Sequence, residues 1–158
     1  MIEPGSTYLV MGLLDTQSIA WVIGQTLARL GGRVVYSMQD ELLRRRYLDP
    51  SLASAAAAPG PLDIRYCDVT VADQVRDLFA GLGPLAGVVH SLAYANPRTC
   101  LGQEFHTDAL ADIQKSYHVT CASLATVARY AAAHMPGGGA LVTLSFDTHH
   151  AYPLYNWM

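Results

Sequence analysis

The short segment that follows the first apolar run has the composition of a phosphate-binding turn. It reads GLLDTQSIA, from Gly12 to Ala20. Gly12 permits a tight backbone turn, and a helix that begins near Ser18 presents free N–H groups and a positive dipole end to a pyrophosphate. The segment lacks the G-x-G-x-x-G fingerprint of dinucleotide-binding proteins. An ordinary strand-to-helix turn capped by Ser18 therefore explains it equally well.

A second polar position follows the second apolar run, in the segment SMQDE. Enzymes that bind NAD often have an acidic residue here, which binds the ribose hydroxyls. The carboxamide of Gln39 can hydrogen-bond to an adenosine in its place, and no arginine immediately follows to bind a 2′-phosphate. The run from Arg44 to Arg46 lies further on and is typical of a solvated helix face.

Aromatic residues and histidines gather near the C-terminal end, in SFDTHHAYPLYNWM. Taken alone, Tyr155 is more often a packing residue with a satisfied hydroxyl than a catalytic group. His149 and His150 are adjacent, so in an extended loop they point apart and do not bind one metal ion together. His90 ends a buried apolar run, and we expect a hydrogen-bonded core histidine there and no general base.

Composition limits the classes of partner. The 158 residues suffice for one domain with a buried core, so we expect residues 1–158 to form a single domain. With 15% charged residues and a net charge of −3, the chain has no attraction to nucleic acid or to an anionic membrane surface. No apolar run has the length of a membrane span. Small molecules and other proteins are the expected partners.

The cysteines indicate a reducing compartment. Cys67, Cys100 and Cys121 are widely spaced and odd in number, which fits neither a disulfide framework nor a zinc site. We expect reduced thiols and no metal. The N-terminus has no basic segment followed by an apolar core, so we expect no signal peptide and a cytoplasmic protein.

Short apolar runs alternate with helical patterns along the chain. Five strands are predicted, in the segments TYLVMG, GGRVVYSM, DIRYCDV, GVVHSLA and ALVTLS. Apolar residues at helical spacing follow the first strand, at Ile19, Ile23, Leu27 and Leu30. Thr70 and Asp73 have the spacing of a capping box that opens another helix. A long helical stretch is predicted from about residue 107 to 135.

This alternation predicts an α/β fold, a Rossmann-like doubly wound parallel sheet with helices on both faces. In such sheets, ligands bind at the carboxyl ends of the strands, near the point where the strand order reverses. The residues that follow the strands are therefore the candidate site.

Five phrases of the sequence resemble one known family. In order and spacing, the phrases are similar to the enoyl-acyl-carrier-protein reductases of the short-chain dehydrogenase/reductase superfamily; they are SIA, CDV, VVHSLAYA, PGGGALVTLSFD and YNWM. The resemblance is strongest to the mycobacterial branch, which also has phenylalanine at the first of two aromatic positions. It covers almost the whole chain.

The resemblance implies a set of cofactor-binding residues. It places Gly12, Ser18 and Ile19 around the pyrophosphate and the nicotinamide end. The residues that it places around the adenine and after the fourth strand are Asp68, Val69, Ser91 and Ala93. Ala93 stands where the family has glycine, and its methyl group narrows the approach of the backbone to the cofactor.

The resemblance also implies a reaction. The family transfers hydride from NADH, which we expect here in preference to NADPH, to the trans-2 double bond of an enoyl thioester during fatty acid biosynthesis. The carrier is acyl-carrier protein or coenzyme A, and the expected assembly is a homo-oligomer. Phe146 matches the aromatic residue near the nicotinamide. Tyr155 matches the tyrosine that donates a hydrogen bond to the thioester carbonyl, where negative charge develops.

The family lysine that binds the nicotinamide ribose would fall past Met158. We therefore expect a sheet that is truncated after about the fifth strand, with ALVTLS as an exposed edge, and a chain that by itself is inactive or weakly active. Three interpretations stay open, in this order of preference. The chain is part of a longer active reductase, a non-catalytic dinucleotide-binding remnant, or a half-domain that associates through its open sheet edge.

Overall fold

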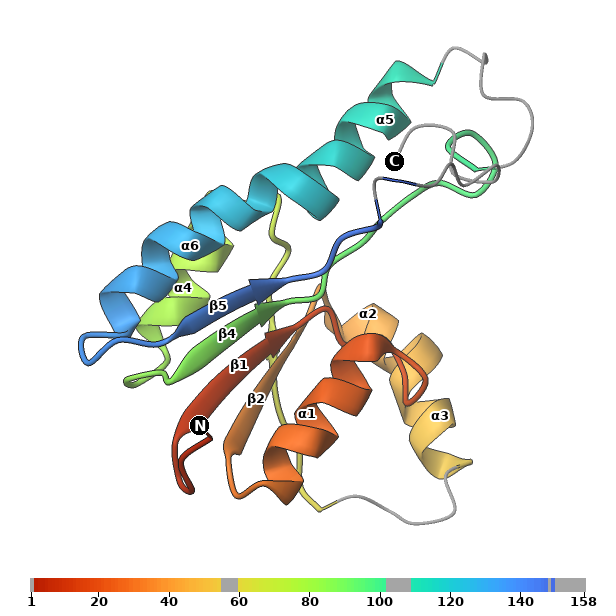
Figure 1. Ribbon diagram of the computed structural model, residues 1–158. Helices are drawn as coiled ribbons and strands as arrows, with labels where there is room; N and C mark the ends of the chain where they lie inside the picture. The colour runs from red at the N-terminus through yellow and green to blue at the C-terminus, as the bar shows by residue number, and fades with distance from the viewer. Residues whose placement is uncertain (1, 55–59, 102–108, 148, 150–158) are drawn as a thin grey trace.

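A parallel five-stranded sheet forms the centre of the protein (Figure 1). The computed structural model describes residues 2–54, 60–101, 109–147 and 149. The strands lie in the order β3-β2-β1-β4-β5. Their bounds are β1 Thr7–Met11, β2 Arg33–Met38, β3 Asp63–Tyr66, β4 Gly87–His90 and β5 Ala140–Thr143. All four strand pairs are parallel, and the strand order reverses between the neighbours β1 and β4, so the predicted doubly wound α/β fold is confirmed.

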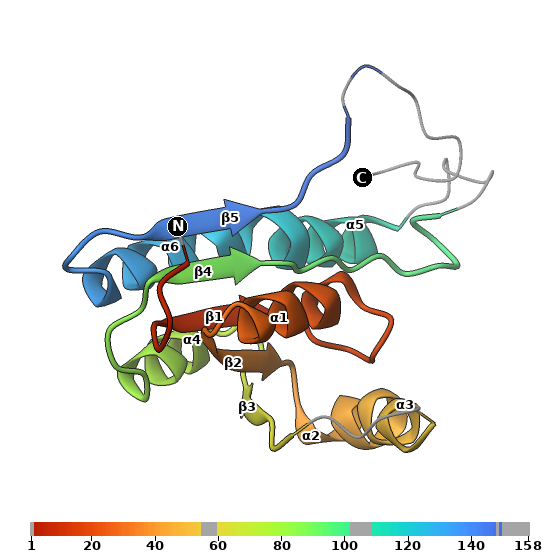
Figure 2. The same ribbon diagram turned by 60° about the horizontal axis from the view of Figure 1, so that its bottom comes forward.

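Helices cover both faces of the sheet (Figures 1 and 2). One face carries α1 (Ile19–Arg29), α2 (Glu41–Leu43), the π-helical turn η1 (Arg44–Leu48) and α3 (Asp49–Ala53). The other face carries α4 (Ala72–Ala80), α5 (Leu110–Tyr117), the π-helical turn η2 (His118–Ala122) and α6 (Ser123–His134). No helix in these described ranges is long and apolar enough to cross a membrane.

Two apolar clusters, one on each face, hold the layers together. Successive strand residues point to opposite faces, so Leu9 and Met11 join the cluster under α4 and α6 while Val10 joins the cluster under α1. The strands have nearly continuous apolar runs because both faces of the sheet are covered.

Helix α1 is capped as predicted, but its buried face differs from the predicted stripe. The Ser18 hydroxyl accepts a hydrogen bond from the Trp21 N–H, 3.4 Å away. Ile19 and Leu30 are 60% and 52% exposed, so neither belongs to the core. Gly24 faces the sheet instead, and a Cβ there would lie 2.1 Å from the Tyr36 hydroxyl. The small residue lets the helix approach the strand closely.

The predicted capping box at the start of α4 is wrong. The helix begins at Ala72, and its N-cap residue, Val71, makes no side-chain hydrogen bond. The Thr70 hydroxyl donates instead to the Asp68 carboxylate, 2.7 Å away. A hydrogen bond to a charged carboxylate is stronger than the bond that the Thr70 hydroxyl would accept as a helix cap. The Thr70 side chain therefore belongs to the preceding turn, where it binds Asp68.

The long helical stretch after β4 is continuous from α5 through η2 to α6, which confirms the main part of the predicted helix. Residues 107 and 108, at its predicted start, lie outside the described residues. Two large apolar side chains of α5, Leu110 and Tyr117, are 61% and 65% exposed.

Strand β5 lies at one edge of the sheet, as predicted. Within the described part of the chain it pairs only with β4. Val142, Leu144 and Phe146 are 48%, 44% and 48% exposed. An edge with exposed apolar side chains favours association with a further strand.

Candidate functional site

The loop after β1 makes a close backbone contact with the end of β4. Gly12 has a φ of +91°, and a Cβ on it would lie 2.0 Å from the Ser91 carbonyl oxygen. The Gly12 and Leu13 N–H groups both donate to the Ser37 carbonyl, over 3.2 and 3.1 Å. An L-amino acid at position 12 therefore meets both backbone strain and a steric clash. Only glycine at position 12 allows the loop after β1 and the end of β4 to pack this closely.

The loop from Gly12 to Ser18 is fixed at several points. The Ser18 hydroxyl donates to the Asp15 carbonyl over 2.7 Å. The Thr16 N–H donates to the Ser51 hydroxyl of α3 over 3.1 Å, and the Thr16 and Ser51 hydroxyls are also in contact. The N-terminus of α1, with the exposed Ile19 as its first residue, follows directly. The helix dipole makes this end a favourable position for an anion.

Gln39 and Asp68 meet beside this loop, although they are far apart in sequence. The Gln39 carboxamide Nε2 donates to Asp68 Oδ2 over 2.9 Å. Asp68 Oδ1 accepts from the Thr70 N–H, 2.9 Å away, and the Asp68 N–H donates to Gln74 Oε1 over 2.8 Å. Because the Gln39 Nε2 donates to the Asp68 carboxylate, the orientation of the Gln39 carboxamide is fixed and its carbonyl oxygen can accept a hydrogen bond from a ligand.

The charge at this pair is negative. Burial favours the neutral form of Asp68, but hydrogen bonds from Thr70 and Gln39 and the positive charge of Lys115 outweigh burial, and the pKa of Asp68 is lowered. Asp40 follows Gln39 and caps α2, accepting from the Leu43 N–H over 2.8 Å. A carboxylate beside the pair disfavours a ligand phosphate at this point.

The arginine run beyond α2 is engaged on the protein surface, which confirms the interpretation as a solvated helix face. Arg44 pairs with Asp49 over 3.1 Å, and Arg45 pairs with Glu41 over 2.7 Å. The side chains of Arg45 and Glu41 are 70% and 59% exposed.

The other predicted cofactor residues lie along the same edge. The Ser91 N–H donates to the Met11 carbonyl over 3.3 Å, and Ala93 is exposed. The Val69 side chain is 6% exposed and belongs to the core under α4, so only its backbone faces the edge. Phe146 follows β5 and is half-exposed, while Tyr155 lies outside the described residues.

His90 is a buried, hydrogen-bonded histidine, as predicted. It is 1% exposed, and its Nε2 lies 2.8 Å from the Ser123 hydroxyl of α6. The Ser123 hydroxyl donates to the Val119 carbonyl, so it accepts from His90 Nε2–H. The Thr143 hydroxyl of β5 lies 3.3 Å from Nδ1. Burial lowers the pKa of His90, which keeps it neutral.

The cysteines offer no reactive thiol at the site. Cys67 follows β3, and burial raises the pKa of its thiol to about 11, so it stays protonated near neutral pH. Cys100 is fully buried and Cys121 is exposed. Among the described residues, no three His, Cys, Asp or Glu side chains are grouped to hold a metal ion.

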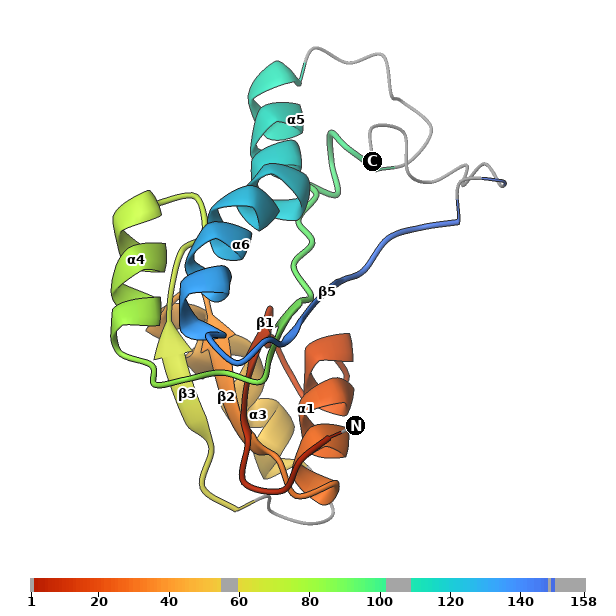
Figure 3. The ribbon, with the colours of Figure 1, turned by 60° about the vertical axis from the view of Figure 1, so that its left-hand side comes forward.

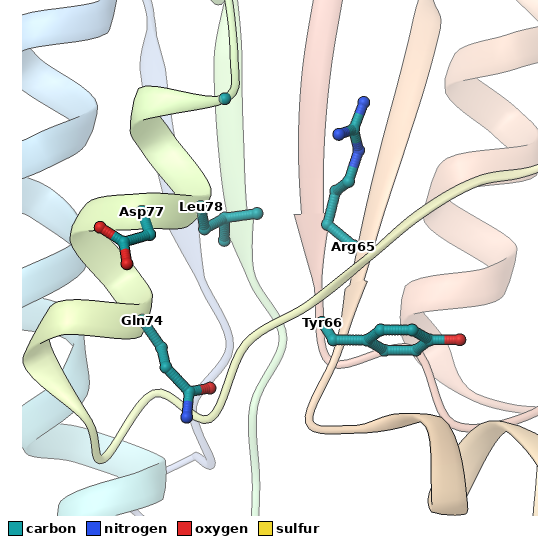
Figure 4. Close-up of a pocket in the computed structure, with 6 residues that line it drawn as sticks. Arg65, Tyr66, Gln74, Asp77 and Leu78 are labelled. Carbon is teal, nitrogen blue, oxygen red and sulfur yellow. The ribbon is translucent and has the colours of Figure 1, made fainter.

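A surface hollow lies away from this edge, between β3 and α4 (Figure 4). Its walls contain none of the predicted cofactor residues; they are Arg65, Tyr66, Gln74, Asp77, Leu78 and Gly81. Arg65 is paired with Asp63 over 2.7 Å. The hollow shares only Gln74 with the contacts described above and has no group directed at a ligand.

Three residues that hold the elements around the site together have no signal in a local motif. Ser51, Thr16 and Gly24 act through partners that are distant in the chain, and no local motif marks them. Gly24 had one usable signal, since glycine is unfavourable inside a helix unless close packing requires it.

Comparison with known proteins identifies relatives of this arrangement. A family model described as enoyl-(acyl carrier protein) reductase matches residues 12–158. The NADH-dependent FabI enzyme of Rickettsia bellii is 28% identical over 159 residues, covering 98% of this chain and 58% of the relative. The NADH-dependent enzyme of Mycolicibacterium smegmatis is 30% identical over 163 residues, covering 98% and 58%.

Solved structures agree with this comparison. FabI from Candidatus Liberibacter asiaticus has a TM-score of 0.79 and 28% identity, covering 99% of this chain and 59% of that chain. The Anaplasma phagocytophilum enzyme in complex with NAD has a TM-score of 0.74 and 28% identity, covering 92% and 55%. The chain spans about three-fifths of the length of the relatives it matches.

The neutral, buried His90 predicts a pH-dependent stability. The pKa of His90 is lower in the folded chain than the unfolded value of about 6.5. The contribution of neutral His90 to the free energy of unfolding is therefore complete above about pH 6.5 and is lost as the pH falls through the folded pKa. Urea unfolding at pH 7.5, 6.5 and 5.5 should show a decline in unfolding free energy, by at most about 1.4 kcal/mol per pH unit from this group.

His90→Gln should flatten this decline, and the exposed His118→Gln serves as the control for loss of one imidazole. An equal pH dependence in wild type and His90→Gln would show that His90 does not cause it.

Proposed function

The chain belongs to the enoyl-(acyl carrier protein) reductase family, and from this premise we propose that it binds NADH at the carboxyl edge of its sheet. It forms the dinucleotide-binding part of an enzyme that reduces the trans-2 double bond of an enoyl thioester in fatty acid biosynthesis. The relatives named above are NADH-dependent, which supports this cofactor.

The contact between Gly12 and Ser91 carries the cofactor proposal. A Cβ at position 12 would clash with the Ser91 carbonyl, so only glycine lets the loop after β1 pack against the end of β4 at the carboxyl edge of the sheet. In sheets of this kind, that edge at the reversal of strand order is where dinucleotides bind. The pyrophosphate is then bound over Gly12 and the start of α1, by backbone N–H groups near Ser18 and Ile19. Ser91 and Ala93 form the wall after β4.

The adenosine end is assigned to the pair of Gln39 and Asp68. The Gln39 carbonyl oxygen is an acceptor for a ribose hydroxyl, because its Nε2 already donates to Asp68. The backbone at Asp68 and Val69 borders the adenine. Proximity of two carboxylates, Asp68 and Asp40, favours NADH over NADPH.

The chemistry needs one further donor. The bound cofactor supplies a hydride to the β-carbon of the enoyl thioester. We assign to the Tyr155 hydroxyl the hydrogen bond to the thioester carbonyl oxygen, where negative charge develops, a donor that typically contributes about 10²–10³ in rate. Phe146 is assigned to the nicotinamide end. The substrate carrier is acyl-carrier protein or coenzyme A.

A homo-oligomer is part of the proposal. Leu110 and Tyr117 stand seven positions apart on α5 and are 61% and 65% exposed, an apolar stripe suited to a second copy of the chain.

A second function is favoured by the exposed edge of β5. There the chain would associate with another strand through Val142, Leu144 and Phe146. NADH oxidation with a crotonyl thioester supports the reductase, and NADH binding without turnover supports a dinucleotide-binding remnant. A stable complex that protects the β5 amides from hydrogen exchange supports the half-domain.

Gly12→Ala should weaken cofactor binding. The substitution forces a left-handed backbone on alanine and places its Cβ against the Ser91 carbonyl. We expect the affinity for NADH, measured by calorimetric titration, to fall by more than about tenfold. Gly5→Ala is the control, because Gly5 also has a positive φ, +82°, but no atom within 4 Å of its Cβ position. Equal NADH affinities for the two variants would contradict the assignment.

Gln39→Arg should relax the preference for NADH. We expect the wild-type chain to bind NADH at least about tenfold more tightly than NADPH, because the 2′-phosphate would lie near Asp68 and Asp40. An arginine at position 39 offers a partner for that phosphate and should narrow the ratio. Gln114→Arg adds the same charge at an exposed position of α5 and serves as the control. An unchanged ratio in Gln39→Arg would place the ribose elsewhere.

A further inference from the structure

A row of polar side chains on α5 and η2 holds the loop that follows β4. We propose that Asp112, Ser116 and Thr120 are positioning residues, which fix this loop so that Ser91 and Ala93 form one wall of the cofactor site. The inference rests on the proposed NADH site and assigns to it three residues that do not touch the cofactor.

Spacing places the three residues on one face of the helix. They follow one another at four-residue intervals, and residues four apart are neighbours on a helix surface. We call Asp112, Ser116 and Thr120 the α5 stripe. Ser123, three residues further on, continues this face and hydrogen-bonds His90 at the end of β4. The loop that leaves β4 runs beside the helix formed by α5 and η2 (Figure 3), and these polar groups contact it.

Two residues of the stripe bind the backbone of Tyr94. The Tyr94 N–H donates to the Thr120 hydroxyl over 3.1 Å, and the Ser116 hydroxyl donates to the Tyr94 carbonyl over 2.6 Å. Ser116 is only 3% exposed. Both backbone polar groups of one loop residue are thus bound by side chains of one helix. The Lys115 ammonium lies 4.8 Å from the centre of the Tyr94 ring and holds its side chain on the same helix.

The third residue binds the next turn of the loop. Asp112 Oδ2 accepts from Asn96 Nδ2 over 2.9 Å and from the Thr99 hydroxyl over 2.7 Å. The Asn96 carbonyl in turn accepts from the Cys100 N–H over 2.8 Å, which closes the turn. One carboxylate therefore fixes two loop side chains, and bonds to an ionised acceptor are the stronger kind.

The position of this loop sets how the end of β4 packs against the loop after β1. Tyr94 follows Ala93 directly, and the Ser91 carbonyl packs so closely on Gly12 that a methyl group would not fit between them. A small displacement of Tyr94 is therefore transmitted to Ser91 and Ala93, the residues assigned to the wall of the proposed cofactor site. A buried hydroxyl such as that of Ser116 is costly unless it is hydrogen-bonded. Its bond to the Tyr94 carbonyl meets this need and fixes the loop, which supports a positioning role for the α5 stripe.

Thr120→Val tests the proposal with little change of shape. Valine keeps the β-branched volume but leaves the Tyr94 N–H without its acceptor. We expect the affinity for NADH to fall by roughly tenfold and the Tyr94 amide to exchange its hydrogen faster. Thr120→Ser retains the hydroxyl and should restore the affinity to within about twofold of wild type.

Two further variants complete the test. Asp112→Asn weakens the acceptor for Asn96 and Thr99 and should lower NADH affinity in the same direction. It serves as the second probe if Thr120→Val does not fold. Thr26→Val removes a hydroxyl from α1, which lies across the sheet from the α5 stripe, and should leave the NADH affinity unchanged. Thermal unfolding of each variant separates loss of affinity from loss of folded protein.

The outcomes distinguish the two proposals. If the wild-type chain binds no NADH, the cofactor assignment itself fails and the positioning role fails with it. If the wild-type chain binds NADH and folded Thr120→Val and Asp112→Asn bind it equally well, the positioning role alone is wrong, even where hydrogen exchange at Tyr94 is faster. Loss of affinity in Thr120→Val that Thr120→Ser does not restore would also overturn it.

Discussion

The close approach of Gly12 to the Ser91 carbonyl joins the two halves of the sheet. It exists because β1 and β4 are neighbours, with Met11 in register with His90. Along the chain, this pairing comes after β2 has taken the other side of β1 and β3 has paired with β2. The contact between Gly12 and Ser91 therefore lies where the strand order reverses, and the elements that shape it come from both halves of the sheet. The loop after β1 is held from one face by Ser51, and the loop after β4 is held from the other.

Much of the fold was predictable from the sequence, because strands buried on both faces and helices with periodic apolar residues leave strong patterns. Three details were also predicted correctly: the Ser18 cap, the buried His90 and the exposed edge of β5. Each depends on neighbours within a few residues or on the order of the strands. The capping box failed because Asp68, outside the motif, attracts the Thr70 hydroxyl. The apolar stripe of α1 failed at Ile19, at the first turn of the helix, beyond the part that packs on the sheet.

For the candidate site, the sequence indicates single residues but not their arrangement. A pattern identifies Gln39 and Asp68 separately, while the bond between them joins positions that are 29 residues apart. The contact between Thr16 and Ser51 spans 35 residues and links the loop after β1 to helix α3. Such pairs follow from the three-dimensional path of the chain, since short polar side chains in loops have many possible partners. Among the described residues, no buried side-chain nitrogen or oxygen is left without a partner, so these long-range bonds complete the polar interior.

Strand order also bears on how the sheet assembles. From β1 to β2 and from β2 to β3, each new strand can dock on the one synthesised just before it, and β5 docks likewise on β4. Only β4 has to return to a strand formed much earlier, when Gly87 pairs beside Tyr8. Bringing distant segments together costs more chain entropy than docking adjacent ones, so this return is the least local event in assembly. It is also the event that brings the Ser91 carbonyl to Gly12. This contact therefore forms with the least local strand pairing, so a chain that has not closed β4 onto β1 has not yet assembled this edge of the sheet.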